Sequence, residues 1–311
     1  MNRIAAIDLG SLTVRLAVAE ITGPGRFRVL GHYRAITALA RGLTKNGKLA
    51  AGSMARTLKA LETFAAKAQE LGVQKSAAAA TQAVRQAANR EAFLAEVENL
   101  GIPVRVLSPE EEARLTLKGV LSALDRSWVD AGPLLVIDVG GGSSEFVLLK
   151  PGSEPVFAGL PLGVLTLSQE FPVGDPPEAE KVGILRHTIK ERLQGFINEN
   201  FADLLQEPPV LVGTAGTVTT LAALALKMTD YDPQRVNNLV LDKSQIDAMA
   251  AEMLALPEAD RARLPGLEAA KAGVMPAGVL IIQTILEIFP RESLVVIDAG
   301  LLEGLLAEMA A

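Results

Sequence analysis

The sequence IAAIDLGS at residues 4–11 has a counterpart, LVIDVGGGSSE, at residues 135–145. Each stretch is an apolar run that ends in an aspartate and a glycine turn. Glycine lets backbone N–H groups approach anionic oxygens, and an aspartate at the end of a strand is placed to hold a divalent cation. One such turn would be weak support, because strand-Asp-Gly turns are common. Two copies about 130 residues apart predict two related halves that bind a phosphate chain.

The composition limits the classes of partner. A chain of 311 residues can form two domains with a core each. Its 30 basic and 36 acidic side chains form no block of like charge, so we expect neither nucleic acid nor a membrane as partner. A polyanionic substrate then has to be bound by local amides, a metal and a few Arg or Lys side chains.

The residue types also indicate the compartment and the chemistry. The absence of cysteine excludes disulfides, a thiolate nucleophile and cysteine-based zinc sites, and it fits a cytoplasmic protein. The chain opens without the apolar core of a signal peptide, and no apolar run approaches the roughly 20 residues that span a bilayer.

Alternating strand-like and helical segments predict an α/β protein with mixed sheets. Three apolar runs open each half, which favours two like domains, residues 1–124 and 125–311. For the last helix, packing back on the first domain is an open alternative. Strands are expected at Ile4–Asp8, Val14–Glu20, Phe27–Gly31, Ser76–Thr81, Ile102–Leu107, Leu134–Asp138, Glu145–Leu149, Pro155–Leu160, Val210–Val212 and Leu294–Asp298, and helices at 52–71, 90–100, 109–124, 177–201, 276–288, after Thr217 and from Leu301.

The first turn offers several groups to a phosphate. The amides of Gly10 and Ser11, the hydroxyls of Ser11 and Thr13, and the guanidinium of Arg15 are the candidates. For Arg15, the alternative is an outward-facing residue on an alternating strand. Asp8 ends the preceding strand, and we favour a metal-linked role for it.

The second turn is the most specific element. Asp138 ends a buried apolar strand, where an uncompensated carboxylate is costly, so a cation or turn amides must satisfy it, and a metal-linked role is favoured. Three consecutive glycines make sense where the main chain folds around a ligand. Glu145 points either into the site or to solvent. The phosphate-binding candidates here are Gly140, Gly141, Gly142, Ser143 and Ser144.

A third small-residue loop leads into a helix. Gly213, Thr214, Gly216 and Thr217 are further phosphate-binding candidates, because a helix N-terminus attracts anions. The alternative is a tight connection between strand and helix without a ligand.

The acidic run Glu110–Glu112 opens a helix. Ser108 and Glu111 form a capping box, and acids in a first turn favour the helix dipole. Hydrolysis of a phosphoanhydride also needs a carboxylate that orients a water, and one of the three glutamates is a candidate. Since cysteine is absent and His32 and His187 lie outside every motif, direct attack by water is favoured over a covalent phosphoenzyme.

Taken together, the motifs resemble the exopolyphosphatase and guanosine pentaphosphate phosphatase family, in the actin, Hsp70 and sugar-kinase superfamily. The resemblance implies two ribonuclease-H-like (actin-like ATPase) domains with mixed sheets facing across a cleft, in the short two-domain form. Its marks are DLGS at 8–11 with Arg15-Leu16, TQAVR at 81–85 with Asn89, SPEEEAR at 108–114, DVGGGSSE at 138–145, GTAGT at 213–217, YDP at 231–233 with Arg235-Val236, and LPGL at 264–267.

The same resemblance assigns roles. Glu112 looks like the base that activates water, with Glu111 as the neighbour to test. Asp138 would hold Mg²⁺ through the phosphates with support from Glu145, and Arg85 would contact the phosphate chain. The implied activity is release of the terminal phosphate of inorganic polyphosphate, with guanosine pentaphosphate as a second substrate, in a homodimer paired through the second domains.

Four positions depart from the family pattern. Leu12, Ala38, Gly273 and Leu302 stand where relatives carry polar or charged residues, which thins the positive lining expected for long polyphosphate. Two alternatives therefore stay open. One is a kinase of the same superfamily, which would yield a phosphorylated acceptor, and the other is a catalytically weak sensor that binds nucleotide or polyphosphate.

Overall fold

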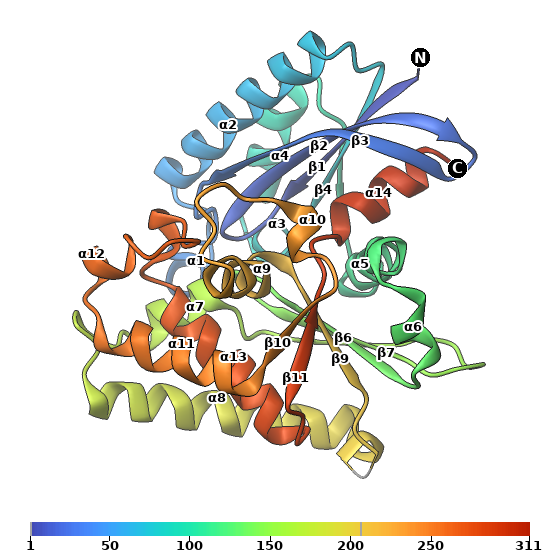
Figure 1. Cartoon of the computed structure of the whole chain (residues 1–311). Coiled ribbons are helices and arrows are strands. Elements are labelled where there is room, and N and C mark those ends of the chain that lie inside the picture. The colour runs from blue at the N-terminus through green and yellow to red at the C-terminus, as the bar shows by residue number, and fades with distance from the viewer. Residues whose placement is uncertain (1, 206) are drawn as a thin grey trace. The chain divides into compact units, whose positions relative to one another are not determined.

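The computed structural model describes residues 2–205 and 207–311 and forms two compact units (Figure 1). The first unit runs to Ser122 and includes Ala299–Ala311, and the second comprises Ala123–Asp298. The chain therefore passes out of the first unit once and returns to it for the last helix. The expected division after residue 124 lies two residues from the observed one, and the last helix belongs to the first unit.

The first unit is built on a five-stranded sheet in the order β3-β2-β1-β4-β5. The first three strands are antiparallel, whereas β4 and β5 run parallel to β1, so the sheet is mixed. The strands are β1 (Arg3–Leu9), β2 (Thr13–Gly23), β3 (Arg26–Ile36), β4 (Lys75–Ala80) and β5 (Val104–Val106), and the helices are α1 (Leu43–Asn46), α2 (Ala51–Glu70), α3 (Gln82–Gln86), α4 (Arg90–Asn99), α5 (Pro109–Ala123) and α14 (Leu301–Met309).

Helix α14 packs its leucines on one face of this sheet. The face is lined by small side chains such as Ala6 and Ala17, which allow the helix to approach closely. Leu302 and Leu306 of the helix are buried against them. The end of the chain thereby completes the core of the unit that the first strand begins.

Helices α5 and α14 meet through glycines. A Cβ on Gly119 would overlap the Gly300 carbonyl oxygen, and a Cβ on Gly304 would overlap the Leu115 carbonyl oxygen. No side chain fits at these positions, so the two helices lie in backbone contact. The position of α5, which carries the acidic run, is thus set by the last helix.

The second unit holds a six-stranded mixed sheet in the order β10-β11-β9-β6-β7-β8. Helices α8, α11 and α13 lie together in Figure 1, and contacts between α13 and its neighbours bury every residue from Met275 to Leu286. The elements are α6 (Arg126–Asp130), β6 (Leu134–Val139), β7 (Ser144–Leu149), β8 (Val156–Leu160), α7 (Val164–Glu170), α8 (Ala179–Asn200), η1 (Ala202–Leu205), β9 (Val210–Thr214), α9 (Ala215–Ala225), α10 (Pro233–Val236), β10 (Leu239–Asp242), α11 (Lys243–Ala255), α12 (Glu258–Arg261), η2 (Ala269–Lys271), α13 (Met275–Ile288) and β11 (Ser293–Val296).

Every strand and helix that the sequence predicts is present, with shifted ends. The sequence predicted that β3 ends at Gly31, but its pairing with β2 continues to Ile36. The register of this pair is irregular between Val18 and Ala19 of β2. The sequence did not predict α11 or β10, because prolines near these segments obscured the pattern. Helices α3 and α7 were also missed because they are short. No helix in the described part of the chain is long and apolar enough to cross a membrane.

Two adjacent asparagines of the second unit bind the backbone where the chain enters and leaves it. Asn238 Oδ1 accepts from Asp125 N at 2.8 Å, and Asn238 Nδ2 donates to the Ala123 carbonyl at 2.9 Å. Asn237 Oδ1 accepts from Asp298 N at 2.7 Å. Asn238 has a φ of 62°, which asparagine tolerates better than most residues. The turn at Asn237 and Asn238 thus holds both the first and the last residues of the second unit.

The glycine contacts of α14 lead to a test of stability. Gly304→Ala has to separate α14 from the Leu115 carbonyl oxygen, and such overpacking costs about 1–3 kcal/mol. Gly183→Ala in α8 is the matched control, because no atom lies within 4 Å of the added Cβ. The control should gain about 0.5–1 kcal/mol from better helix propensity. Urea unfolding measures both changes, and an unaltered Gly304→Ala protein would contradict the packing.

Candidate functional site

The turn between β1 and β2 forms a tight hairpin. Gly10 N donates to the Thr13 carbonyl at 3.2 Å, and a Cβ on Gly10 would lie 2.7 Å from that oxygen. Gly10 is therefore required by the close approach of the chain. Gly10 and Thr13 are both partly exposed.

Asp8 and Arg15 face each other across this hairpin. They are paired in register, and Arg15 donates to Asp8 Oδ2 from Nη2 at 2.7 Å and from Nε at 3.0 Å. Asp8 is 4% exposed, and its Oδ1 is buried without a hydrogen-bond partner. The structure thus places the guanidinium of Arg15 on a carboxylate, where the sequence predicted a phosphate contact.

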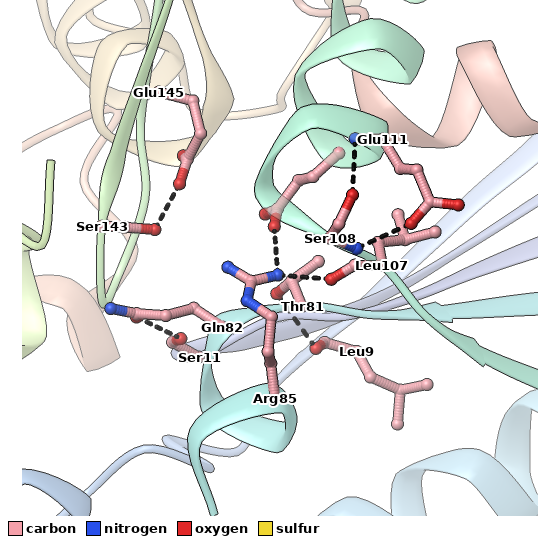
Figure 2. A network of polar contacts seen from close by, with 11 residues as sticks. Leu9, Ser11, Thr81, Gln82, Arg85, Leu107, Ser108, Glu111, Ser143 and Glu145 are labelled. Carbon is pink, nitrogen blue, oxygen red and sulfur yellow. Dashed lines mark hydrogen bonds and ion pairs between the residues drawn. The ribbon is translucent and has the colours of Figure 1, made fainter. Parts of the chain in front are cut away.

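The tip of the turn is held by the main chain. The Leu12 carbonyl accepts from Thr37 N at 3.0 Å and from Ala38 N at 2.9 Å. Ser11 is buried, and its Oγ lies 3.5 Å from Gln82 Oε1, a weak hydrogen bond (Figure 2). The hydroxyl of Ser11 therefore serves the fold of the turn.

The three glutamates at the start of α5 have different surroundings. Glu111 Oε2 accepts from Ser108 N at 2.8 Å, and Glu111 N donates to Ser108 Oγ at 3.1 Å, which is the predicted capping box. Glu110 Oε1 pairs with Arg114 Nη2 at 2.8 Å on the exposed surface. The side chain of Glu112, by contrast, is only 13% exposed.

Arg85 joins α3 to the start of α5. Its Nη1 lies 3.1 Å from Glu112 Oε2 and donates to the Leu107 carbonyl at 2.6 Å, and Figure 2 shows Arg85 beside that carbonyl. Nε and Nη2 of Arg85 make no hydrogen bond within the described residues. The structure therefore brings together Arg85, which only the family resemblance had singled out, and Glu112, one of the three glutamates considered as a base.

The turn between β6 and β7 repeats the first hairpin with one change of charge. Gly140 N donates to the Ser143 carbonyl at 2.9 Å, and Asp138 is paired in register with Glu145. The residue opposite the aspartate is thus an acid, where the first hairpin has an arginine. Glu145 is 7% exposed and accepts from Ser143 Oγ. Two neighbouring carboxylates repel each other, which favours a bound cation.

The glycine run is packed under α7. The carbonyls of Gly140 and Gly141 accept from the first backbone N–H groups of that helix, Val164 N at 3.0 Å and Leu165 N at 2.8 Å. A Cβ on Gly163 would overlap the backbone of Gly142. Gly163, the residue before α7, is thus required by the close approach of the glycine run.

Three predicted phosphate-binding residues are structural in this unit. Ser144 is fully buried and donates to the Leu162 carbonyl at 2.6 Å. Thr217 is 4% exposed and donates to the Val139 carbonyl at 2.8 Å, which ties α9 to the end of β6. Gly213 has no room for a Cβ beside Val218. Thr214 is also buried, whereas Gly141, Ser143 and Gly216 are partly exposed.

Lys271 lies at the first turn of α9, although sequence reasoning assigned it no role. It is 6% exposed, and its Nζ lies 3.2 Å from Thr220 Oγ1 and 3.2 Å from Glu268 Oε2. A Cβ on Gly216 would lie 3.4 Å from the same nitrogen. The only sequence signal was its position just after the LPGL motif.

The donor set fits Mg²⁺. This ion binds through one or two carboxylates and completes its shell with water and substrate phosphates. Asp138 and Glu145 supply adjacent carboxylates within the second unit. In the first unit, taken by itself, Asp8 has a buried oxygen without a hydrogen-bond partner. The described residues contain no group of three or more His, Asp or Glu that could hold a metal alone. Water and phosphate would have to provide the remaining ligands.

Both histidines have ordinary surroundings, as expected. His32 Nε2 lies 3.8 Å from Glu303 Oε1, and burial raises the pKa of that carboxyl. His187 is exposed on α8 and pairs with Glu191 one turn away. Neither residue contacts a predicted site residue.

Comparison with known proteins gives one consistent family. The model of the Ppx/GppA phosphatase family matches residues 17–311. Exopolyphosphatase 2 of Mycobacterium tuberculosis is 27% identical and is matched over 100% of this chain and 99% of its own. Exopolyphosphatase 1 of the same species is 30% identical over 98% of this chain and 87% of its own.

Solved structures agree with the fold. A Ppx/GppA family member from Aquifex aeolicus is 32% identical with a TM-score of 0.78, covering 99% of this chain and 97% of its own. An exopolyphosphatase from Cytophaga hutchinsonii has a TM-score of 0.88 at 22% identity, covering 99% and 98%. The predicted class, an α/β protein with a mixed sheet in each half, is confirmed.

The capping box makes a prediction about pH. Hydrogen bonds from the backbone and side chain of Ser108 hold the pKa of Glu111 below its ordinary value. Such a carboxyl stabilises the fold above its unfolded pKa and loses that effect as the pH falls. Glu111→Ala should lower the urea midpoint at pH 7, and the difference should shrink between about pH 5 and pH 3. A difference that stays constant over this range would contradict the assignment.

Proposed function

The chain belongs to the Ppx/GppA phosphatase family, and we propose that it is an exopolyphosphatase, a phosphoanhydride hydrolase that releases the terminal phosphate of inorganic polyphosphate. Its relatives at 27% and 30% identity bear that name. One observation carries the assignment of the base. Of the three acids at the start of α5, only Glu112 is neither capping the helix nor paired on the exposed surface.

Glu112 is the proposed general base. Its carboxylate accepts a proton from a water whose oxygen forms a bond to the terminal phosphorus. The bond from that phosphorus to the bridging oxygen breaks in line, and the bridging oxygen becomes the new chain end. Arg85 holds Oε2 of Glu112 at 3.1 Å, which fixes the orientation of the carboxylate toward the water.

The phosphate charge is met by several groups. In the first unit, Nε and Nη2 of Arg85 are the proposed donors to phosphate oxygens, and the partly exposed turn at Gly10 offers backbone amides. In the second unit, the partly exposed turn at Gly141 has the same proposed role. In the second unit, Lys271 adds a positive charge beside Gly216 at the start of α9. Such preorganised donors stabilise the charge that builds up during phosphoryl transfer.

Mg²⁺ completes the proposal. When bound, it neutralises phosphate oxygens and the negative charge on the leaving group. Asp138 with support from Glu145 is the proposed holder, because the two carboxylates stand opposite each other in register at the second hairpin. Asp8, whose Oδ2 binds Arg15, is the corresponding candidate of the first hairpin.

The wider proposal follows the family resemblance. Guanosine pentaphosphate contains the same phosphoanhydride bond and is a second substrate to test. A homodimer is part of the proposal because the family resemblance implies it, and a cytoplasmic location is part of it because the lack of cysteine fits that compartment. Sedimentation analysis of the full chain measures the oligomeric state.

The central test is Glu112→Gln, which keeps the size of the side chain and removes its charge. We expect phosphate release from polyphosphate to fall by roughly 10²–10⁴-fold, the usual contribution of a general base. Glu110→Gln is the matched control, since that exposed side chain faces Arg114 and should leave turnover unchanged. Circular dichroism checks that both variants fold. Full activity in Glu112→Gln would refute the assignment.

A second set of assays separates the alternatives. Phosphate release is measured from long polyphosphate and from guanosine pentaphosphate, with Mg²⁺ and after its removal by chelation. A hydrolase gives free phosphate only when Mg²⁺ is present. A phosphorylated acceptor instead of free phosphate would indicate a kinase, and tight binding with negligible release would indicate a sensor.

A further inference from the structure

Arg261 is a buried cation without a carboxylate partner in its hydrogen bonds. It lies at the end of α12 and is 2% exposed. Its guanidinium donates only to backbone carbonyls, those of Ala272 at 3.0 Å, Met253 at 3.1 Å and Leu256. Burial lowers the pKa of Arg261. Burying a charge is unfavourable, and among the described residues only the nearby Asp175 and Glu258 oppose this effect, so the residue needs an explanation beyond filling space.

The three acceptors belong to two segments that are distant along the chain. Met253 and Leu256 lie at the C-terminal end of α11, where helix carbonyls lack partners within the helix. Ala272 directly follows Lys271. The planar guanidinium can bind both segments at once because its donors form a rigid fork. Arg261 therefore fixes the residue next to Lys271 against the end of α11.

The segment that carries Lys271 also packs closely on α9. Gly266 has a φ of 97°, and a Cβ there would overlap the Ala223 carbonyl oxygen in that helix. At the other end, Lys271 contacts Thr220, whose hydroxyl donates to the Gly216 carbonyl at 2.6 Å. The segment is therefore seated along α9 at Gly266 and at Lys271.

We propose that Arg261 is a positioning residue that acts through Lys271, holding the lysine ammonium at the first turn of α9, where it binds an anionic phosphate oxygen. This inference rests on the proposed function, in which Lys271 supplies a positive charge beside Gly216 at the start of α9. Arg261 itself is buried and does not contact the substrate. Its contribution is the placement of a charge on another segment.

The test compares Arg261→Lys and Arg261→Gln with Arg263→Lys. Lysine at position 261 keeps the charge but lacks the planar set of N–H donors, and glutamine keeps one donor group without the charge. Arg263 is the control because it is an exposed neighbour paired with Asp260. The KM for polyphosphate should rise roughly tenfold in both Arg261 variants, with kcat changed much less. Arg263→Lys should behave like the wild type. Unchanged KM values in folded Arg261 variants would overturn the proposal.

A double-mutant cycle with Lys271→Ala separates positioning from a general effect on stability. If Arg261 acts through Lys271, Arg261→Lys adds little further loss in KM once Lys271 is removed. If the two losses add in full, Arg261 acts by another route and the proposal is wrong. Hydrogen exchange gives a second measure, in which the amides of Ala272 and Val274 should exchange faster in Arg261→Lys but not in Arg263→Lys.

Calorimetry of inorganic tripolyphosphate binding tests the role of Arg261 separately from the proposed hydrolase function. A wild-type protein that binds tripolyphosphate without hydrolysing it contradicts the proposed function, and weaker binding by Arg261→Lys would still support the inference. Binding that is unaffected by Lys271→Ala would overturn the inference whatever the turnover. If neither Arg261 variant folds, the residue is required for the fold and the positioning role is withdrawn.

Discussion

The constraint on which both units depend is the need to neutralise an aspartate at the end of a buried strand. In the first hairpin the residue opposite Asp8 is Arg15, and the two form an ion pair at 2.7 Å. In the second, the residue opposite Asp138 is Glu145, so the same backbone arrangement presents two acids. A cross-strand pair of like charge is unfavourable without a cation. The duplicated hairpin therefore supplies an internally balanced turn in one unit and a candidate metal site in the other.

The helix cap explains why three consecutive acids can have different chemistry. Ser108 and Glu111 determine where α5 begins, and the helical geometry then directs Glu110 and Glu112 to different sides. Glu110 reaches Arg114 one turn along the same helix, whereas Glu112 reaches Arg85 on α3. Glu111 thus caps the helix terminus, and Glu110 forms an ion pair on the helix surface. The third acid is held by a cation from another element, which limits the orientations of its carboxylate.

Local patterns in the sequence were sufficient for the strands, the hairpins and the capping box, because each depends on residues that are neighbours in the chain. Contacts between distant segments could not be derived in this way. The pair of Arg85 and Glu112 spans 27 residues, and Lys271 reaches Thr220 across 51. Residue type alone also could not predict that the hydroxyls of Ser144 and Thr217 bind backbone carbonyls in the core. A small polar residue in a turn can serve a ligand or the fold, and only its burial distinguishes the two.

The positions that depart from the family pattern differ in what they do to the fold. Leu12 keeps the shape of the first turn, because its carbonyl accepts the hydrogen bonds from Thr37 and Ala38. Ala38 is buried with a φ of 48°, so the segment that holds the turn adopts a conformation that is uncommon for alanine. Leu302 is part of the apolar contact between α14 and the sheet, where a charge would be costly. Leu12 and Ala38 thus leave the main chain of the first hairpin in place, whereas Leu302 contributes to the core of the first unit.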